Sequence, residues 1–83
     1  MDVSARRKLV SDYMCKITGS RGLDDSIDVF ETGLVSSLAS IQIIAFIEKN
    51  FRVKVKVDDL DKANFCSVEA ICAFLTRKVA LDA

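Results

Sequence analysis

The sequence of 83 residues contains no histidine. Histidine is the commonest general base and metal ligand near neutral pH, so its absence removes every catalytic triad built on imidazole and the usual residues of zinc chemistry. We therefore expect a protein that is not itself an enzyme and that holds no metal.

An excess of either charge is also missing, because 12 Lys and Arg residues balance 12 Asp and Glu residues. Nucleic acids and anionic membrane surfaces are bound through a basic excess, so we expect neither as a partner. The longest stretch without a charge, residues 32–47, contains several hydroxyl side chains and is too short to cross a bilayer. The first dozen residues lack the apolar core of a secretory signal. We expect a cytoplasmic protein with no membrane insertion.

Cysteine is present in an odd number, as Cys15, Cys66 and Cys72, with no C-x-x-C spacing. This usage does not fit a disulfide framework or a metal knuckle, and it is typical of reduced thiols in the cytosol. We expect the three side chains to behave as small hydrophobic residues in or near the core.

Apolar residues recur at helical spacing in three segments. The first covers residues 4–18, with Ser4 as N-cap and Gly19 as terminator. The second covers residues 38–51, and its inward stripe consists of Ser40, Ile43, Ile44, Ile47 and Phe51. The third follows Ser67 as N-cap, and its buried face consists of Val68, Ile71, Cys72, Leu75 and Val79.

The segments between these helices carry weaker signals. Residues 19–36 predict a long loop pinned to the core by Ile27, Phe30 and Leu34. Residues 52–57 alternate basic and apolar residues, but a lone strand has no ladder partner, so we expect an extended connector with Val53, Val55 and Val57 turned inward. Residues 58–63 predict one short helical turn. The fold class is therefore all-α: one domain over residues 1–83, a small four-helix bundle of three longer helices and one short helix, with a long loop between helices one and two.

Two adjacent serines stand at the start of the second helix, after the flexible Gly33. Ser36 can cap the free amides of the first turn, and Ser37 then projects outward at the positive helix end, where another enzyme can reach it and where an anion is favoured. Ser40 is a second candidate, but it lies on the inward stripe. The alternative is that both leading serines only cap the helix. No base lies near Ser37 in the sequence, so this serine would be a substrate for a partner enzyme.

The segment DVFETGLVSSLASIQIIAFIEKNF resembles the second helix of acyl carrier proteins and its approach, and VKVDDLDKANFCSVEAICAFLTRK is similar to their third and fourth helices. The resemblance implies a carrier whose serine is modified with phosphopantetheine from coenzyme A, the thiol of which holds an intermediate as a thioester. Ser37 and Leu38 fall at the modified serine and the Leu that follows it. Ser36 stands where the family usually has Asp, a residue that the phosphopantetheinyl transferase normally meets.

The spacing in GLVSSLASIQ, one residue longer between Gly and Ser than the usual pattern, is similar to that of free-standing carriers of polyketide extender units. These hold aminomalonyl, hydroxymalonyl or methoxymalonyl groups made from tethered seryl or glyceryl groups. The implied partners are an adenylating or loading enzyme, dehydrogenases, and an acyltransferase or polyketide synthase. The chain starts at helix one and ends after helix four, so we expect a discrete monomer acting in trans.

Two other functions stay open. The same spacing occurs in D-alanyl carrier proteins, so an aminoacyl carrier for cell-envelope modification is one alternative. An unmodified helical interaction module is the other.

Partner recognition is expected on the flank of the second helix that the inward stripe does not use. Leu38, Ile41 and Ala45 lie there, and Leu34 in the preceding loop extends this apolar strip. Fatty-acid carriers are typically acidic at this place, whereas Ala39 and Gln42 are neutral here, so we expect partners to use apolar contacts rather than charge. The alternative is that the strip belongs to the edge of the core.

Overall fold

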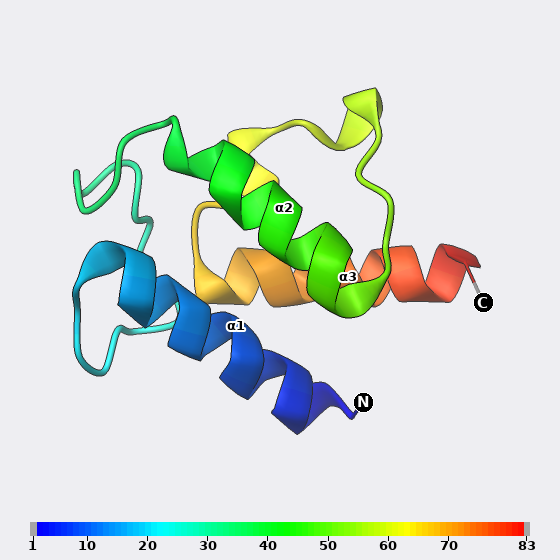
Figure 1. Cartoon of the computed structure of the whole chain (residues 1–83), viewed down its shortest axis with the longest axis horizontal. Coiled ribbons are helices and arrows are strands. Elements are labelled where there is room, and N and C mark those ends of the chain that lie inside the picture. The colour runs from blue at the N-terminus through cyan, green and yellow to red at the C-terminus, as the bar shows by residue number, and fades with distance from the viewer. Residues whose placement is uncertain (1, 83) are drawn as a thin grey trace.

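Three α-helices and two 3₁₀ turns form the computed structural model, which describes the backbone of residues 2–82 and the side chains of residues 2–79 (Figure 1). The helices are α1 (Val3–Thr18), α2 (Ala39–Phe51) and α3 (Val68–Asp82). The backbones of α1 and α3 pack directly against each other, and α2 lies across the front of α3 in Figure 1. The predicted all-α class is confirmed, and residues 2–82 contain no strand.

The predicted fourth, short helix is not found as a single element. Two 3₁₀ turns, η1 (Val57–Asp59) and η2 (Lys62–Asn64), take its place. Between them Asp61 has an extended backbone, and its side chain accepts a hydrogen bond from the Ala63 amide, 2.9 Å away. This local cap starts a new turn instead of continuing the first one.

Helix α1 begins earlier than predicted. Asp2 is its N-cap, with Oδ1 accepting from the Ala5 amide at 2.7 Å, so the prediction of Ser4 as cap is wrong. Asp and Ser are equally good N-cap residues, and here Asp2, two positions before Ser4, occupies the N-cap position. The predicted terminator is confirmed, because Gly19 adopts the left-handed conformation (φ 70°) at the end of the helix.

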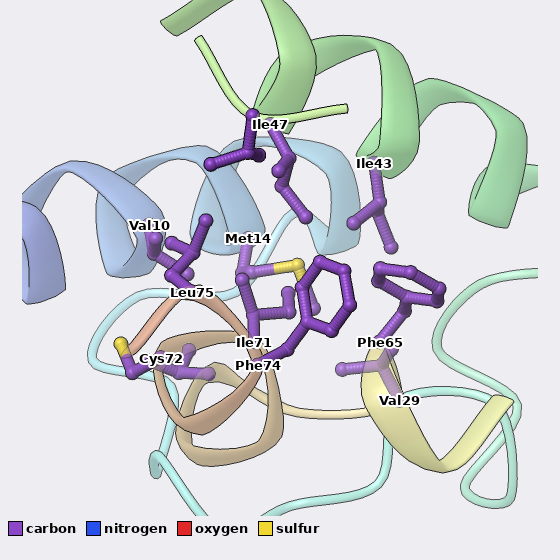
Figure 2. Packing of buried hydrophobic residues seen from close by; sticks show 12 residues of the cluster. Val10, Met14, Val29, Ile43, Ile47, Phe65, Ile71, Cys72, Phe74 and Leu75 are labelled. Atoms are coloured by element: carbon purple, nitrogen blue, oxygen red, sulfur yellow. The ribbon is translucent and has the colours of Figure 1, made fainter. Parts of the chain in front are cut away.

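The core lies where the three helices meet (Figure 2). Ile43 and Ile47 of α2 are fully buried, as the stripe predicted. The rings of Phe65 and Phe74 meet edge to face beneath them, with centroids 5.2 Å apart. The other fully or nearly fully buried hydrophobic side chains are Val10, Met14, Val29, Val68, Ile71 and Leu75.

The buried face of α3 differs from the prediction at its far end. Ser67 caps the helix as expected, since its Oγ accepts from the Ala70 amide at 3.0 Å. Val79 is 45% exposed, so the prediction that its side chain lies on the buried face is wrong. Lys78 lies on the buried side instead, because it follows Leu75 by three residues and is neutralised by an acidic partner.

The connector and the long loop also pack differently from the prediction. Val53 is buried and Val55 is half-buried, but Val57 is 82% exposed because η1 begins there and turns it outward. In the long loop the buried anchor is Val29, whose amide donates to the Cys66 carbonyl at 2.8 Å. Phe30 packs against the core from one side, as predicted.

The other two predicted loop anchors are corrected by this arrangement. Ile27 is half-buried and outside the core cluster, and Leu34 is 39% exposed. The amide of Val35 donates to the Val29 carbonyl at 3.2 Å, which draws the chain back to the core one residue after Leu34. Hydrogen bonds to Val29 and packing of Phe30 therefore fix the loop.

Three of the four acids in residues 24–31 shape the loop. Asp24 accepts from both the amide and the hydroxyl of Ser26, which lowers the pKa of its carboxyl. Asp25 pairs with Arg7 of α1, and its carbonyl accepts from Glu69 at the start of α3 at 2.9 Å. Asp28 Oδ1 accepts hydrogen bonds from the backbone amides of Phe30 and Glu31, at 3.0 and 2.9 Å. Asp24 and Asp28 therefore stabilise turns within the loop, and Asp25 ties the loop to α1 and α3.

Two isoleucines of α2 should respond very differently to truncation. Ile43→Ala removes a fully buried side chain, so we expect the free energy of unfolding to fall by about 2–5 kcal/mol. Ile41 is 66% exposed, and Ile41→Ala should change it by less than about 0.5 kcal/mol. Urea denaturation measures both values. Equal losses in the two variants would contradict the described orientation of α2.

Gly33 has a left-handed backbone (φ 78°) with open space around it, so only backbone strain opposes a side chain there. Gly33→Ala should lower the free energy of unfolding by about 1–2 kcal/mol. Asn tolerates this conformation, so Gly33→Asn should lower it by less, and the same denaturation experiment compares the two. A larger loss for Asn than for Ala would contradict the strain argument.

Candidate functional site

Ser37 lies in an exposed turn that leads directly into α2. The turn is held by backbone hydrogen bonds between residues three apart. The amides of Ala39 and Ser40 donate to the carbonyls of Ser36 and Ser37, at 3.0 and 3.2 Å. Gly33 supplies the left-handed backbone that lets the chain approach this turn. Ser37 is therefore presented at the surface, at the N-terminal end of a well-packed helix.

The predicted side-chain cap at Ser36 is not observed. The N-cap position is occupied by Leu38, whose backbone is already helical, and no side chain caps the helix there. Ser36 contributes its backbone carbonyl to Ala39 instead. The reason is that the tight turn before the helix brings backbone carbonyls to the first donating amides, so the N-cap position lies two residues after the predicted cap.

The three serines of this segment differ in what their hydroxyls do. Ser40 is half-buried and donates its hydroxyl to the Ser37 carbonyl at 2.7 Å. Ser36 and Ser37 are both exposed, and within the described part of the chain their hydroxyls make no hydrogen bond. The exposed pair is thus available to another protein, whereas the Ser40 hydroxyl is engaged.

The backbone around Ser37 suits an anion. Among residues 2–82, no backbone amide between Val35 and Ala39 donates to another backbone group, so the amides of Ser36, Ser37 and Leu38 point to no backbone acceptor. Free amides and the dipole at a helix N-terminus both favour negative charge nearby. A phosphodiester on a serine of this turn would meet both, so the residues present fit a covalently attached phosphate group.

The apolar strip predicted on α2 is exposed. Leu38 and Ile41 are 74% and 66% exposed, Ala45 is also exposed, and Leu34 precedes them at the turn. Since Ile43 and Ile47 on the other side are fully buried, Leu38 and Ile41 are not part of the core edge. Exposed apolar side chains grouped beside Ser37 form a surface that another protein could cover.

A groove of about 280 Å³ runs beside this strip. Its α2 wall consists of Ser40, Ile41 and Ile44, and its other wall and floor consist of Leu60, Asp61, Lys62 and Phe65. Leu60 is 59% exposed and was not predicted to belong to the site. An isolated Leu among the acids of DDLDKA has no periodicity, so the sequence offered no signal for it.

A second cavity, of about 440 Å³, lies between the long loop and η2. It is lined by Asp28, Phe30, Glu31, Lys62, Ala63 and Cys66. Lys62 borders both cavities, and its ammonium stands 5.9 Å from the centre of the Phe30 ring. Lys62 therefore forms the ridge between an apolar groove and a more polar cavity.

Cys66 and Cys72 offer no activated nucleophile. Burial raises the pKa of both the Cys66 and the Cys72 thiols, which keeps them protonated at neutral pH. All three cysteines are free, in agreement with the prediction of reduced thiols. Among the side chains of residues 2–79, no group of three acidic, cysteine or histidine residues is placed to hold a metal ion. No helix in residues 2–82 is long and apolar enough to span a membrane.

Comparison with known proteins gives concordant results. Residues 8–75 match the family model described as "Phosphopantetheine attachment site". The chain is 29% identical over 66 residues to the D-alanyl carrier protein of Lacticaseibacillus casei, which covers 77% of this chain and 82% of that protein. It is also 29% identical over 56 residues to the probable acyl carrier protein PigG of a Serratia strain, covering 68% of this chain and 64% of that protein.

The family model covers both the turn that presents Ser37 and most of the core that supports it. Domains of this family attach a phosphopantetheine prosthetic group and carry intermediates on it for other enzymes. The exposed serine turn, the free amides around it and the helical fold all agree with that role. The chain therefore belongs to the phosphopantetheine-binding carrier-protein family.

Proposed function

We propose that Ser37 carries the phosphopantetheine group and that the chain presents an acyl or aminoacyl thioester to partner enzymes. The observation that supports Ser37 is the exposed turn before α2, in which its hydroxyl is unengaged while that of Ser40 is bound to a backbone carbonyl. The resemblance of the Ser37–Leu38 pair to the modified serine and following Leu of acyl carrier proteins supports the same choice over Ser36.

The chemistry is divided between the bound group and the chain. Phosphopantetheine supplies the thiol that forms the thioester when it is bound. The turn at Ser37 holds the phosphodiester at the positive end of α2, and the surface around it offers contacts to other proteins. The sequence has no histidine to deprotonate the Ser37 hydroxyl, so the transferase has to supply the base. The chain acts as a carrier and not as a catalyst.

Modification tests the attachment serine directly. The protein is incubated with coenzyme A and a broad-specificity phosphopantetheinyl transferase, and the intact mass is measured. Wild type should gain the mass of one phosphopantetheine group, and Ser37→Ala should gain none.

Two neighbouring variants serve as matched controls. Ser36→Ala and Ser40→Ala should both still be modified, since neither hydroxyl is the attachment point. An adduct on Ser37→Ala, or none on wild type, would contradict the assignment of Ser37 as the attachment point. Absence of any adduct would favour the unmodified interaction module.

We further propose an extender unit of the aminomalonyl or hydroxymalonyl type, or its seryl or glyceryl precursor, as the cargo. The longer spacing between Gly33 and Ser37 supports this choice by resemblance to carriers of such units. The D-alanyl carriers among the relatives support the alternative of a D-alanyl or other aminoacyl cargo. Polyketide or hybrid peptide-polyketide machinery in the cytoplasm would use the first, and cell-envelope modification would use the second.

Loading assays distinguish the two kinds of cargo. The phosphopantetheinylated protein is offered to candidate adenylating enzymes with L-Ser, D-Ala or a glyceryl donor, and the thioester is detected by intact mass. We expect loading by the seryl or glyceryl enzyme. Loading by the D-Ala enzyme alone would assign the aminoacyl alternative.

The partner-binding surface is proposed to consist of Leu34, Leu38, Ile41 and Ala45. Their exposure beside Ser37 and the neutral residues between them support apolar recognition. The partners proposed are the transferase, the loading enzyme, dehydrogenases, and an acyltransferase or polyketide synthase. Each would meet a single monomeric carrier at this surface.

Added charge on α2 tests apolar recognition. The double variant Ala39→Asp, Gln42→Glu should lower kcat/KM of the loading enzyme by roughly tenfold, which corresponds to about 1.4 kcal/mol, because acids would be desolvated in an apolar contact. The matched control Ser4→Asp, Ala5→Glu adds the same charge on exposed positions of α1 and should leave kcat/KM unchanged. Unchanged or improved turnover of the α2 variant would refute apolar recognition.

A further inference from the structure

A lysine of α3 is buried. Lys78 is only 7% exposed, and its ammonium lies 3.0 Å from Oδ2 of Asp59 in η1. Lysine is almost never buried without a partner, because removing its charge from water is costly. The carboxylate of Asp59 compensates that cost, so the two side chains depend on each other.

Asp59 connects Lys78 to the backbone of the same 3₁₀ turn. Its Oδ2 also accepts from the Lys56 amide at 2.9 Å, and this hydrogen bond and the one from Lys78 lower the pKa of its carboxyl. A second tie lies next to it, because Asn64 Nδ2 donates to the Asp59 carbonyl at 2.9 Å. Arg77 of α3 in turn donates to Asn64 Oδ1 at 2.8 Å. Side chains of α3 thus hold both η1 and η2.

Apolar burial does not fix this segment. Val53 and Phe65 are buried at its two ends, but no residue from 54 to 64 is fully buried. Val57 and Leu60, its most apolar side chains apart from Val55, are 82% and 59% exposed. Hydrophobic packing usually positions a segment of this kind. Here the ion pair and hydrogen bonds to α3 position it instead.

The segment forms one wall of the groove beside Ser37. Leu60, Asp61 and Lys62 lie on this wall, and Ser40, Ile41 and Ile44 of α2 line the same groove. The α2 wall is fixed by the core through Ile43 and Ile47. The two walls are therefore positioned by different interactions, one by burial and the other by the ion pair.

We propose that Asp59 and Lys78 are positioning residues whose ion pair sets the second wall of this groove, so that Leu60 lines it together with Ile41 and extends the apolar partner-binding surface from α2 to η1. The proposal rests on the proposed function only where it treats Ile41 as part of that surface. It adds Leu60 to the surface, and it assigns the placement of Leu60 to a buried charge pair.

Hydrogen exchange and methyl contacts in the full-length protein test the positioning. In Lys78→Met, amide exchange over residues 57–64 should become roughly tenfold to a hundredfold faster, as expected for loss of a hydrogen bond between charged groups. Exchange in the cores of α1 and α2 should stay within about twofold of wild type, because the apolar core is intact. NOE contacts of the Leu60 methyl groups with the α2 residues that line the groove should weaken.

Three further variants separate positioning from general stability. Lys54→Met removes an exposed lysine of the connector and should change neither measurement. Lys78→Arg keeps the charge and should restore part of the protection that Lys78→Met loses. If Lys78→Met fails to fold, the double variant Asp59→Asn, Lys78→Met removes both charges, leaves no unpaired ion in the interior, and should show the same local loss.

The results that overturn the proposal are specific. Unchanged exchange over residues 57–64 in the lysine variant or the double variant would show that the ion pair does not position the wall. Equally faster amide exchange in α1, α2 and residues 57–64 would show that the ion pair only supports the stability of the whole fold. Phosphopantetheinylation of Ser37 in these variants should proceed as in wild type. The mass measurement therefore tests the attachment at Ser37 independently of the exchange measurements that test the ion pair.

Discussion

Burial of one face of α2 is the constraint on which the site depends. Ile43 and Ile47 are fully buried against the ring pair of Phe65 and Phe74, and they fix the rotation of the helix about its axis. With 3.6 residues per turn, that rotation leaves Leu38 and Ile41 facing solvent. The core therefore decides both where Ser37 stands and which side chains surround it.

Several charged side chains position the irregular segments of this small domain. The acids of the long loop bind amides, a hydroxyl and Arg7, and the acid of η1 binds a buried lysine. These contacts position the two segments that contain no α-helix, which are the loop before α2 and the connector after it. The helix that presents Ser37, by contrast, has no charged residue before Glu48. The domain thus uses ion pairs and caps for its irregular segments and leaves the presenting surface apolar.

Much of the fold could be predicted because helical periodicity is a local property. The stripe of α2, the cap at Ser67 and the terminator at Gly19 all follow from residues within a turn or two of each other. Two of the errors arose where a distant contact outweighed the local pattern. Lys78 took the inward place predicted for Val79 because Asp59, nineteen residues away in the chain, neutralises it. Val29 became the loop anchor because its amide reaches the Cys66 carbonyl.

The sequence by itself determined the helices, the absence of imidazole chemistry and the position of the serine pair before an apolar helix. Each of these depends only on residue type and on short-range spacing. Three other features emerge only in the folded molecule: Ser36 does not cap the helix, the Ser40 hydroxyl is engaged, and Leu60 lines the same groove as Ile41. These facts depend on how a turn is closed and on how separate segments meet, and such distances are set by packing and by charge pairs between residues that the sequence places far apart.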